Sequence, residues 1–137
     1  MIDVAIIETG SGGDLIYRTP DLQPARGVEN MPYGLMFGGN ASEPWWGNDL
    51  LMPNTPFSCL TQDALLNNPL TSQGRINIEA AMNADLQVLI DNIPGTTIGL
   101  TTAIAGPDRL EAEIKINGQI FLAVWNPDAQ FLTYTLQ

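Results

Sequence analysis

The sequence predicts a single α+β domain, spanning residues 1–137, in which one long helix packs on an antiparallel sheet. Apolar residues at helical spacing run through positions 75–92 and predict the helix. Beyond it, apolar and polar residues alternate around Asn117-Gly118, which is the favoured two-residue hairpin turn. A chain of 137 residues can bury a sizeable core without disulfide bonds. The expected order is an N-terminal hairpin, a helical middle and an antiparallel sheet.

The first part of the chain predicts a hairpin, a loop and a short helix. IDVAIIE is apolar and β-branched, the glycine-rich TGSGGD closes it, and LIYRT follows, which is typical of two strands joined by a turn. PDLQPARG is expected to be a loop. A helix is expected over residues 28–37, with Met31, Leu35 and Phe37 facing inward. Pro32 then lies in its first turn, where a missing N–H costs nothing.

The middle of the chain carries the strongest helical signal. Glycines and prolines recur over positions 38–56 and predict a long loop, and FSCLTQDALLNN is expected to form a short helix that Pro69 stops. RINIEAAMNADLQVLIDN follows, and Pro94-Gly95 ends it. Arg75 and Glu79 lie four residues apart and are expected to pair, at a gain of roughly 0.3 kcal/mol. One apolar face recurs at spacings of four, four, three and four and is expected in the core: Ile78, Met82, Leu86, Leu89 and Ile93.

After this helix the apolar period changes to two. TTIGLTTAIAG is rich in threonine and β-prone, RLEAEIKI alternates strictly, and QIFLAVW returns after the turn. AQFLTYTLQ at the C-terminus is expected to form one more short strand, at an edge of the sheet. These segments predict the antiparallel sheet.

The two-residue turn sets the register of the central hairpin. The second strand is apolar on both faces, because Ile120, Leu122 and Val124 lie on the face away from the core. Cover for these three residues is expected partly from this chain and partly from another chain. The expected pairs on the core face are Ile116–Gln119, Ile114–Phe121 and Ala112–Ala123, and those on the reverse face are Lys115–Ile120, Glu113–Leu122 and Glu111–Val124.

Composition restricts the kind of partner. Charged residues make up 15% of the chain, well below the roughly 25% of an average soluble domain. Such a surface is natural for a subunit that hides much of itself in an assembly. The net charge is −10, so the chain lacks the basic footprint that nucleic acids require, and anionic membranes would repel it. We therefore expect protein partners, with no nucleic acid and no membrane.

The chain offers few groups for catalysis. It has no histidine and one cysteine, Cys59, which excludes an internal disulfide, the common histidine-based nucleophile systems and the usual zinc sites. Its acids are scattered, so a small carboxylate hydrolase is the least favoured alternative. No catalytic, metal or cofactor site is expected. No long apolar run and no basic leader are present, which favours the cytoplasm as the place of synthesis.

The segment GGNASEPWWGND places Trp45 and Trp46 between turn-forming residues, so both are expected in a loop. They could form a platform for a ligand, plug the core beneath the loop, or dock onto another protein. Adjacent residues of an extended segment point to opposite sides. We therefore expect one indole to hold the loop to the domain and the other to face a neighbouring subunit.

Several segments together resemble the baseplate wedge proteins of Mu-like contractile-tailed phages, which are distant relatives of the small wedge protein of T4-type tails. They are GDL after the first strand, VENMPYGLMFGGN leading to WWGN, and NPLTSQGRINIEAAMNADLQVLID before a closing pair of strands. The most specific part is Gly39 with Trp45-Trp46-Gly47. T4-type relatives carry a Glu-Pro-Arg signature for contacts with the wedge core. Here Glu43-Pro44 precedes Trp45, so that role is not transferred.

The resemblance implies a structural role rather than an enzymatic one. It implies a subunit of the virion tail baseplate, assembled in the host cytoplasm, that joins other wedge subunits to the tail sheath protein. Sheath arms would add strands to an exposed sheet edge, and the terminal strands, residues 2–7 and 131–136, are the edges we expect. The alternative is a carbohydrate- or other ligand-binding module that uses the tryptophan loop. The interface candidates are Trp45, Trp46, Ile120, Leu122, Val124, Phe131 and Leu132.

Overall fold

The structure is a computed structural model that describes residues 31–44, 48 and 57–137, with the backbone alone at Phe131 and Leu136. Before residue 31 it describes the backbone of six short strands. No helix in the described part of the chain is long and apolar enough to cross a membrane.

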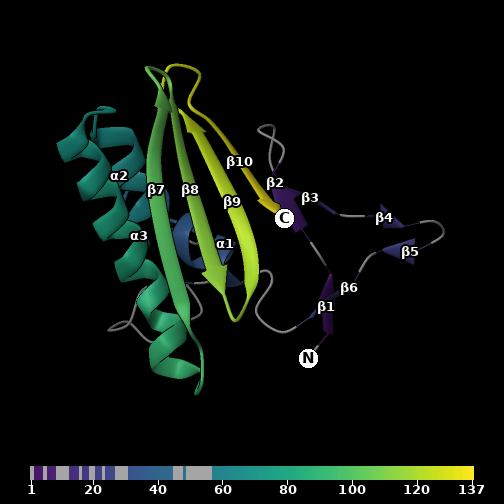
Figure 1. Ribbon diagram of the computed structural model, residues 1–137. Helices are drawn as coiled ribbons and strands as arrows, with labels where there is room; N and C mark the ends of the chain where they lie inside the picture. Colours follow the sequence, from purple (N-terminus) through teal and green to yellow (C-terminus); the bar gives the residue numbers. More distant parts are fainter. Residues whose placement is uncertain are drawn as a thin grey trace.

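The architecture is an antiparallel sheet with helices on one face, and α3 is the longest of them (Figure 1). Four consecutive strands form the main part of the sheet, in the order of the chain. They are β7 (Ile98–Gly106), β8 (Arg109–Ile116), β9 (Gln119–Asn126) and β10 (Phe131–Leu136). The helices are α1 (Met31–Phe37), α2 (Thr61–Asn67) and α3 (Ser72–Asn92). The predicted α+β class, with one long helix packed on an antiparallel sheet, is confirmed.

The strands before α1 pair in three places. β2 (Ile6–Glu8) pairs with β3 (Gly13–Leu15), and β2 also pairs with β10, so the sheet has the order β3-β2-β10-β9-β8-β7. β1 (Ile2–Val4) pairs with β6 (Pro24–Arg26), and β4 (Tyr17–Arg18) pairs with β5 (Asp21–Leu22). The expectation that PDLQPARG is a loop is therefore wrong, because β5 and β6 lie within it.

The predicted position of the C-terminal strand is also wrong. β10 pairs with β9 along its whole length and meets β2 on its other side, where Tyr134 faces Glu8. It therefore lies inside the sheet and not at an edge. The N-terminal run forms no edge of the six-stranded sheet, because β2 lies between β10 and β3 and β1 belongs to a separate two-stranded sheet. The sequence could not show this, since the pairing joins the two ends of the chain.

The α3 helix begins at Ser72, three residues before the predicted start, because Thr71 caps it. The Thr71 hydroxyl accepts a hydrogen bond from the Gly74 N–H at 3.1 Å, which satisfies one of the unpaired donors of the first turn. The predicted apolar face is buried at Ile78, Met82, Leu86 and Leu89, and Ile93 lies partly buried at the C-cap. The prediction that this face packs in the core is confirmed.

The central hairpin has the predicted register at all six positions on both faces. Asn117 and Gly118 have φ angles of 49° and 88°, as a type I′ turn requires. The side chains on the helical face of the sheet complete the core with those of α3: Leu110, Ala112, Ile114, Ile116, Phe121, Ala123, Trp125 and Tyr134.

The α1 helix faces the sheet differently from the prediction. Pro32 and Met36 are buried, whereas Met31 is 46% exposed and Leu35 and Phe37 are half-buried. Pro32 lies in the first turn, as predicted. The helix has only seven residues, and successive residues are about 100° apart around its axis. A shift of one position in the residues expected to face inward therefore selects a different face.

One polar cluster joins α3 to β7. Arg75 Nη1 donates to Glu79 Oε2 and to Thr102 Oγ1, at 2.9 Å each. The Thr102 hydroxyl in turn donates to Glu79 Oε2. The predicted pair of Arg75 with Glu79 is confirmed, and the cluster places the first turns of α3 beside the middle of β7.

We expect Gly74→Ala to lower the free energy of unfolding by about 1–3 kcal/mol, measured by urea denaturation. A Cβ atom at Gly74 would lie 1.9 Å from the Pro69 carbonyl oxygen, so the helix start would have to move. Gly34→Ala is the matched control, because a Cβ there meets nothing within 4 Å. It should raise the stability by about 0.5–1 kcal/mol through helix propensity. Equal effects of the two substitutions would contradict this explanation.

Candidate functional site

A buried carboxylate on α3 holds the start of α2. Asp85 is 7% exposed, and its oxygens accept hydrogen bonds from the backbone N–H groups of Leu60 and Thr61 and from the Thr61 hydroxyl, at 2.6–3.0 Å. Leu60, the N-cap of α2, has no side-chain cap of its own. Asp85 therefore caps α2 from a different helix, where the helix dipole also favours a negative charge.

The long loop between α1 and α2 is closed at its base. Cys59 N donates to the Gly39 carbonyl at 2.8 Å, and the Asn40 side chain bonds to Asp63 of α2 at 2.9 Å. Further along the loop, the Asn48 side chain exchanges two hydrogen bonds with the backbone of Phe57, at 2.7 and 2.8 Å. These contacts hold the described ends of the loop against α2.

Trp45 and Trp46 lie outside the described residues, as do residues 49–56. The expectation that one indole faces the domain and the other faces a neighbour therefore stays a prediction. The described residues that flank them, Pro44 and Asn48, belong to the loop that the Gly39–Cys59 and Asn48–Phe57 contacts close.

The face of the sheet that points away from the helices has an apolar centre. Ile120, Leu122 and Val124 on β9 are half-buried there, and none of the helices lies over this face (Figure 1). Their neighbours on β8 are charged and those on β10 are Thr133 and Thr135. No described helix covers these three candidates, and each of them is partly exposed.

The other two candidates lie on β10. Leu132 pairs with Trp125, is half-buried and packs against the core on the helical face. Leu132 therefore packs at the margin of the core and does not lie at an open edge of the sheet. The backbone of Phe131 pairs with Asn126, and its side chain lies outside the described residues.

The six-stranded sheet has two edge strands, β3 and β7, and β7 is the longer of the two. This nine-residue strand pairs only with β8 among the described strands. It contains neither a charged residue nor a proline, which are two of the devices with which natural proteins protect such edges. Its one irregularity is a shift in register between Ile104 and Gly106.

The register shows which backbone groups of β7 are free. The turn at Asn117-Gly118 makes Ile116–Gln119 a hydrogen-bonded pair, so on β8 the backbone of Glu113 points toward β7. Glu113 pairs with Thr101, whose N–H and C=O therefore point toward β8. The N–H and C=O groups of Leu100 and Thr102, one residue to either side, point away from the sheet.

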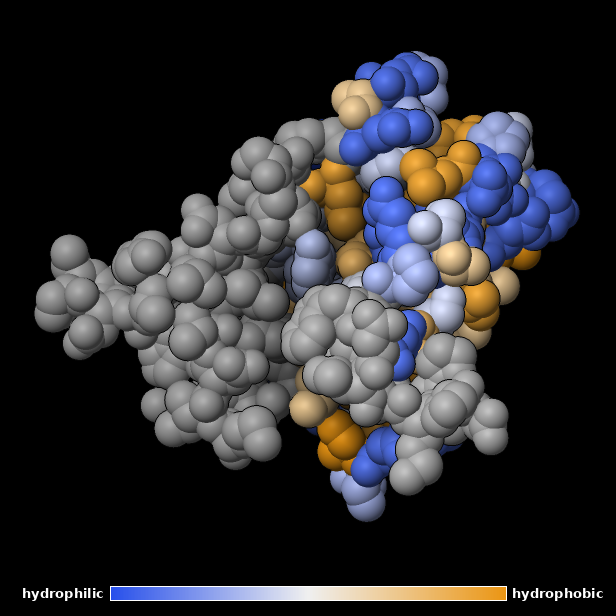
Figure 2. Space-filling view, turned by 180° about the vertical axis from the view of Figure 1, so that it is seen from behind, coloured by the Kyte–Doolittle hydropathy of each residue, from blue (hydrophilic) through white to orange (hydrophobic). Residues whose placement is uncertain are grey.

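Along this edge, apolar side chains at the margin of the core are partly exposed. Ile98 and Leu100 on the helical face of β7 are half-buried, and Ile104 is 36% exposed. On α3, Ile76 and Ile90 are 49% and 41% exposed. Seen from the opposite side, apolar residues lie among hydrophilic ones over the described surface (Figure 2). A further strand beside β7 would cover aliphatic groups that this chain leaves partly in water.

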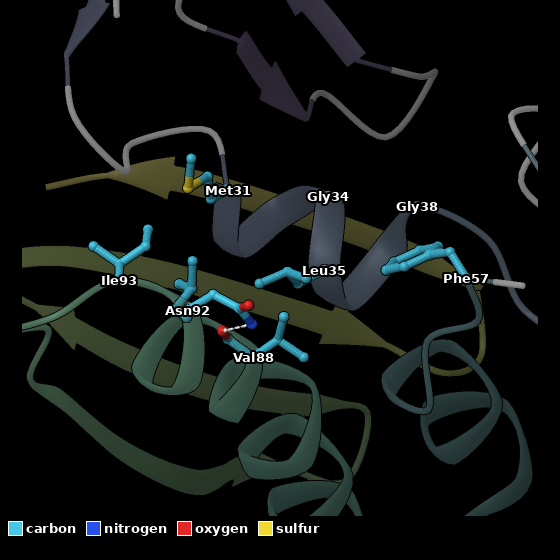
Figure 3. Close-up of a pocket in the computed structure, with 9 residues that line it drawn as sticks. Met31, Gly34, Leu35, Gly38, Phe57, Val88, Asn92 and Ile93 are labelled. Carbon is cyan, nitrogen blue, oxygen red and sulfur yellow. Dashed lines mark hydrogen bonds between the residues drawn. The ribbon is translucent and has the colours of Figure 1, made fainter. Parts of the chain in front are cut away.

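An apolar groove lies on the other flank of α3 (Figure 3). Its volume is about 660 Å³, and α1 forms the wall opposite α3. Asn92 is its one polar side chain with hydrogen-bonding groups among the described lining residues, and its amide donates to the Val88 carbonyl at 2.8 Å. The groove can therefore bury apolar groups but supplies no charge. The lining residues are Met31, Gly34, Leu35, Gly38, Phe57, Val88, Leu89, Asn92 and Ile93.

Two groups that could react, the Cys59 thiol and the Tyr134 hydroxyl, are buried. Burial raises the pKa of the Cys59 thiol, which is the opposite of what a nucleophile requires. Burial also raises the pKa of the Tyr134 hydroxyl. Within residues 31–44, 48 and 57–137, no group of three or more Cys, Asp and Glu side chains could hold a metal ion.

Comparison with protein-family models, with curated proteins and with solved structures found no match to this chain.

We expect Asp85→Asn to lower the free energy of unfolding by about 2–4 kcal/mol, because the new NH₂ group faces backbone donors in a buried site. Asp91→Asn is the matched control on the same helix. Asp91 is exposed and accepts one bond from Gln87, so that change should stay within about 0.5 kcal/mol. Urea denaturation of both variants measures the difference, and a loss of under about 1 kcal/mol for Asp85→Asn would contradict the capping role.

Proposed function

We propose that this chain is a structural subunit of the baseplate of a contractile phage tail. In this role it joins baseplate wedge proteins to the tail sheath by accepting a strand at an open edge of its sheet. The segments around Gly39–Gly47 and at the start of the long helix resemble those of baseplate wedge proteins. This resemblance supports the assignment of the chain to a baseplate.

The observation that carries this proposal is the edge of β7. The outward N–H and C=O groups of Leu100 and Thr102 form the start of a ladder, and an extended segment of another chain can pair with them. Neither charge nor proline opposes such pairing over Ile98–Gly106. Because β10 lies between β9 and β2, strand addition is proposed at β7 and not at the ends of the chain.

Two further features support an assembly role. Charged residues make up only 15% of the chain, and the outer sheet face carries Ile120, Leu122 and Val124 at its centre. A surface of this kind loses little solvation when it is covered by protein. The apolar groove between α1 and α3 adds a second place where a neighbouring chain can bury side chains.

We expect Leu100→Pro to block assembly while the domain still folds. The lost N–H is one that points away from the sheet, so no bond to β8 is removed. Leu100→Ala controls for the lost side chain and should assemble. Thr101→Pro removes a donor that points toward β8, so it should destabilise the domain more than Leu100→Pro does.

The measurements are thermal melting of each variant and its incorporation into tails. Tails would be purified from cells that express the chain with its neighbouring genes, and the position of the chain would be determined by electron cryomicroscopy. We expect the wild-type chain between baseplate and sheath, and Leu100→Pro tails without attached sheath. A chain absent from purified tails would contradict the baseplate role. Normal sheath attachment by Leu100→Pro would contradict strand addition at β7.

A further inference from the structure

We propose that the strand added at β7 comes from a different protein, carries aliphatic side chains toward α3 and places a lysine or arginine beside Thr101. This inference rests on the proposed strand addition and specifies the chemistry of the partner. It follows from the two faces of the β7 edge, which differ in what they can contact.

On the side of the β7 edge that faces the helices, the added strand requires aliphatic side chains. Because Arg75 and Glu79 bond to Thr102, the first turns of α3 lie beside the middle of β7. Ile76 follows Arg75 directly on α3, and Ile104 lies two residues after Thr102 on β7. Ile90 follows Glu79 by eleven residues, about three turns, and so lies on the same flank of α3.

The spacing along this flank matches a strand. Ile76 and Ile90 are separated by about 21 Å along the helix axis, the length of about six residues of an extended chain. In Figure 1, the upper part of α3 projects past β7. The inward side chains of the added strand would bury Ile76, Ile90 and Ile104, which are now 36–49% exposed.

The outer face of the edge calls for a cation at one position. The β7 side chains on this face are small: Gly99, Thr101 and Ala103. A long side chain on the added strand can therefore lie across Thr101 and reach Glu113, which faces Thr101 on β8. The two backbones would be about 10 Å apart, a distance that a lysine and a glutamate side chain together can span.

The neighbouring positions do not share this preference. Glu111, beside Ala103, is already paired with Arg109 at 2.6 Å. Lys115 lies beside Gly99 and would repel a second cation there. Glu113 is exposed and forms no ion pair with a described residue. The cation is therefore specified at the central position alone.

A second copy of the chain does not fit this edge. Two β7 strands paired around Thr101 would place the two Glu113 carboxylates on the same face, and each copy carries a net charge of −10. Nothing on β7 could neutralise them, since the strand has no cation. A partner strand that brings its own lysine or arginine removes this repulsion.

The test uses three synthetic peptides and the full ¹⁵N-labelled chain in about 0.1 M salt, where long-range attraction is largely screened. The peptides are VTVKVTV, VTVEVTV and the polar control STSKSTS, each with blocked ends. We expect VTVKVTV to shift the amide signals of Leu100 and Thr102 more than that of Thr101, because the first two point outward. We expect it to bind about fivefold more tightly than VTVEVTV, and STSKSTS to bind not at all.

Glu113→Lys should reverse the order of the two valine peptides. Asp91→Lys changes the net charge by the same amount on the exposed side of α3 and should leave the order unchanged. This pair of variants separates a local contact from the attraction of a lysine peptide to an acidic protein.

The outcomes test three statements separately: the inferred cation, strand addition at β7, and the origin of the strand in a different protein. Equal binding of the two valine peptides at β7 would overturn the inferred cation but leave strand addition standing. An unchanged order in Glu113→Lys would do the same. No shift of β7 amides with any peptide would overturn strand addition itself, and with it the proposed function. A dimer formed through β7, detected by sedimentation and by the same amide shifts, would overturn the assignment to a different protein.

Discussion

The buried carboxylate of Asp85 is the constraint on which the helical layer depends. It stands where α2 lacks a cap of its own, and it accepts hydrogen bonds from Leu60 and Thr61. A carboxylate removed from water is costly unless such donors surround it, so α2 can shift little against α3. The position of α2 then determines the base of the long loop. The Asn40 side chain bonds to Asp63 of α2, and the Gly39 carbonyl accepts a hydrogen bond from Cys59, just before α2.

The long helix joins this layer to the sheet. One face of α3 supplies Ile78, Met82, Leu86 and Leu89 to the core, while Asp85 faces α2. On the flank toward β7, Arg75 and Glu79 bond to Thr102. The apolar groove beside α1 and the unfinished margin beside β7 therefore lie on opposite flanks of one rigid element. A chain that binds at either place would act on the same helix.

The sheet combines a closed interior with an edge that nothing in the described chain protects. β10 pairs with β9 along its whole length and with β2 at Tyr134, so it lies inside the sheet. β7 is the opposite case, since its outward backbone groups and aliphatic margin both remain accessible. A single added strand would satisfy the hydrogen bonds and cover the isoleucines together, which makes this edge the main candidate for assembly.

Local patterns determined the elements themselves. The 3.6-residue period of Ile78 to Leu89 predicts the buried face of α3, and Asn117-Gly118 predicts the register of the central hairpin, because both depend on residues close in sequence. Only the tertiary structure decided that Asp85 caps α2, and that β10 lies inside the sheet while β7 forms one of its edges. Both results depend on contacts between segments far apart in the chain, such as Leu60 with Asp85 or Glu8 with Tyr134. No periodicity within a segment carries that information, since pairing across the fold is selected by the packing of the whole core.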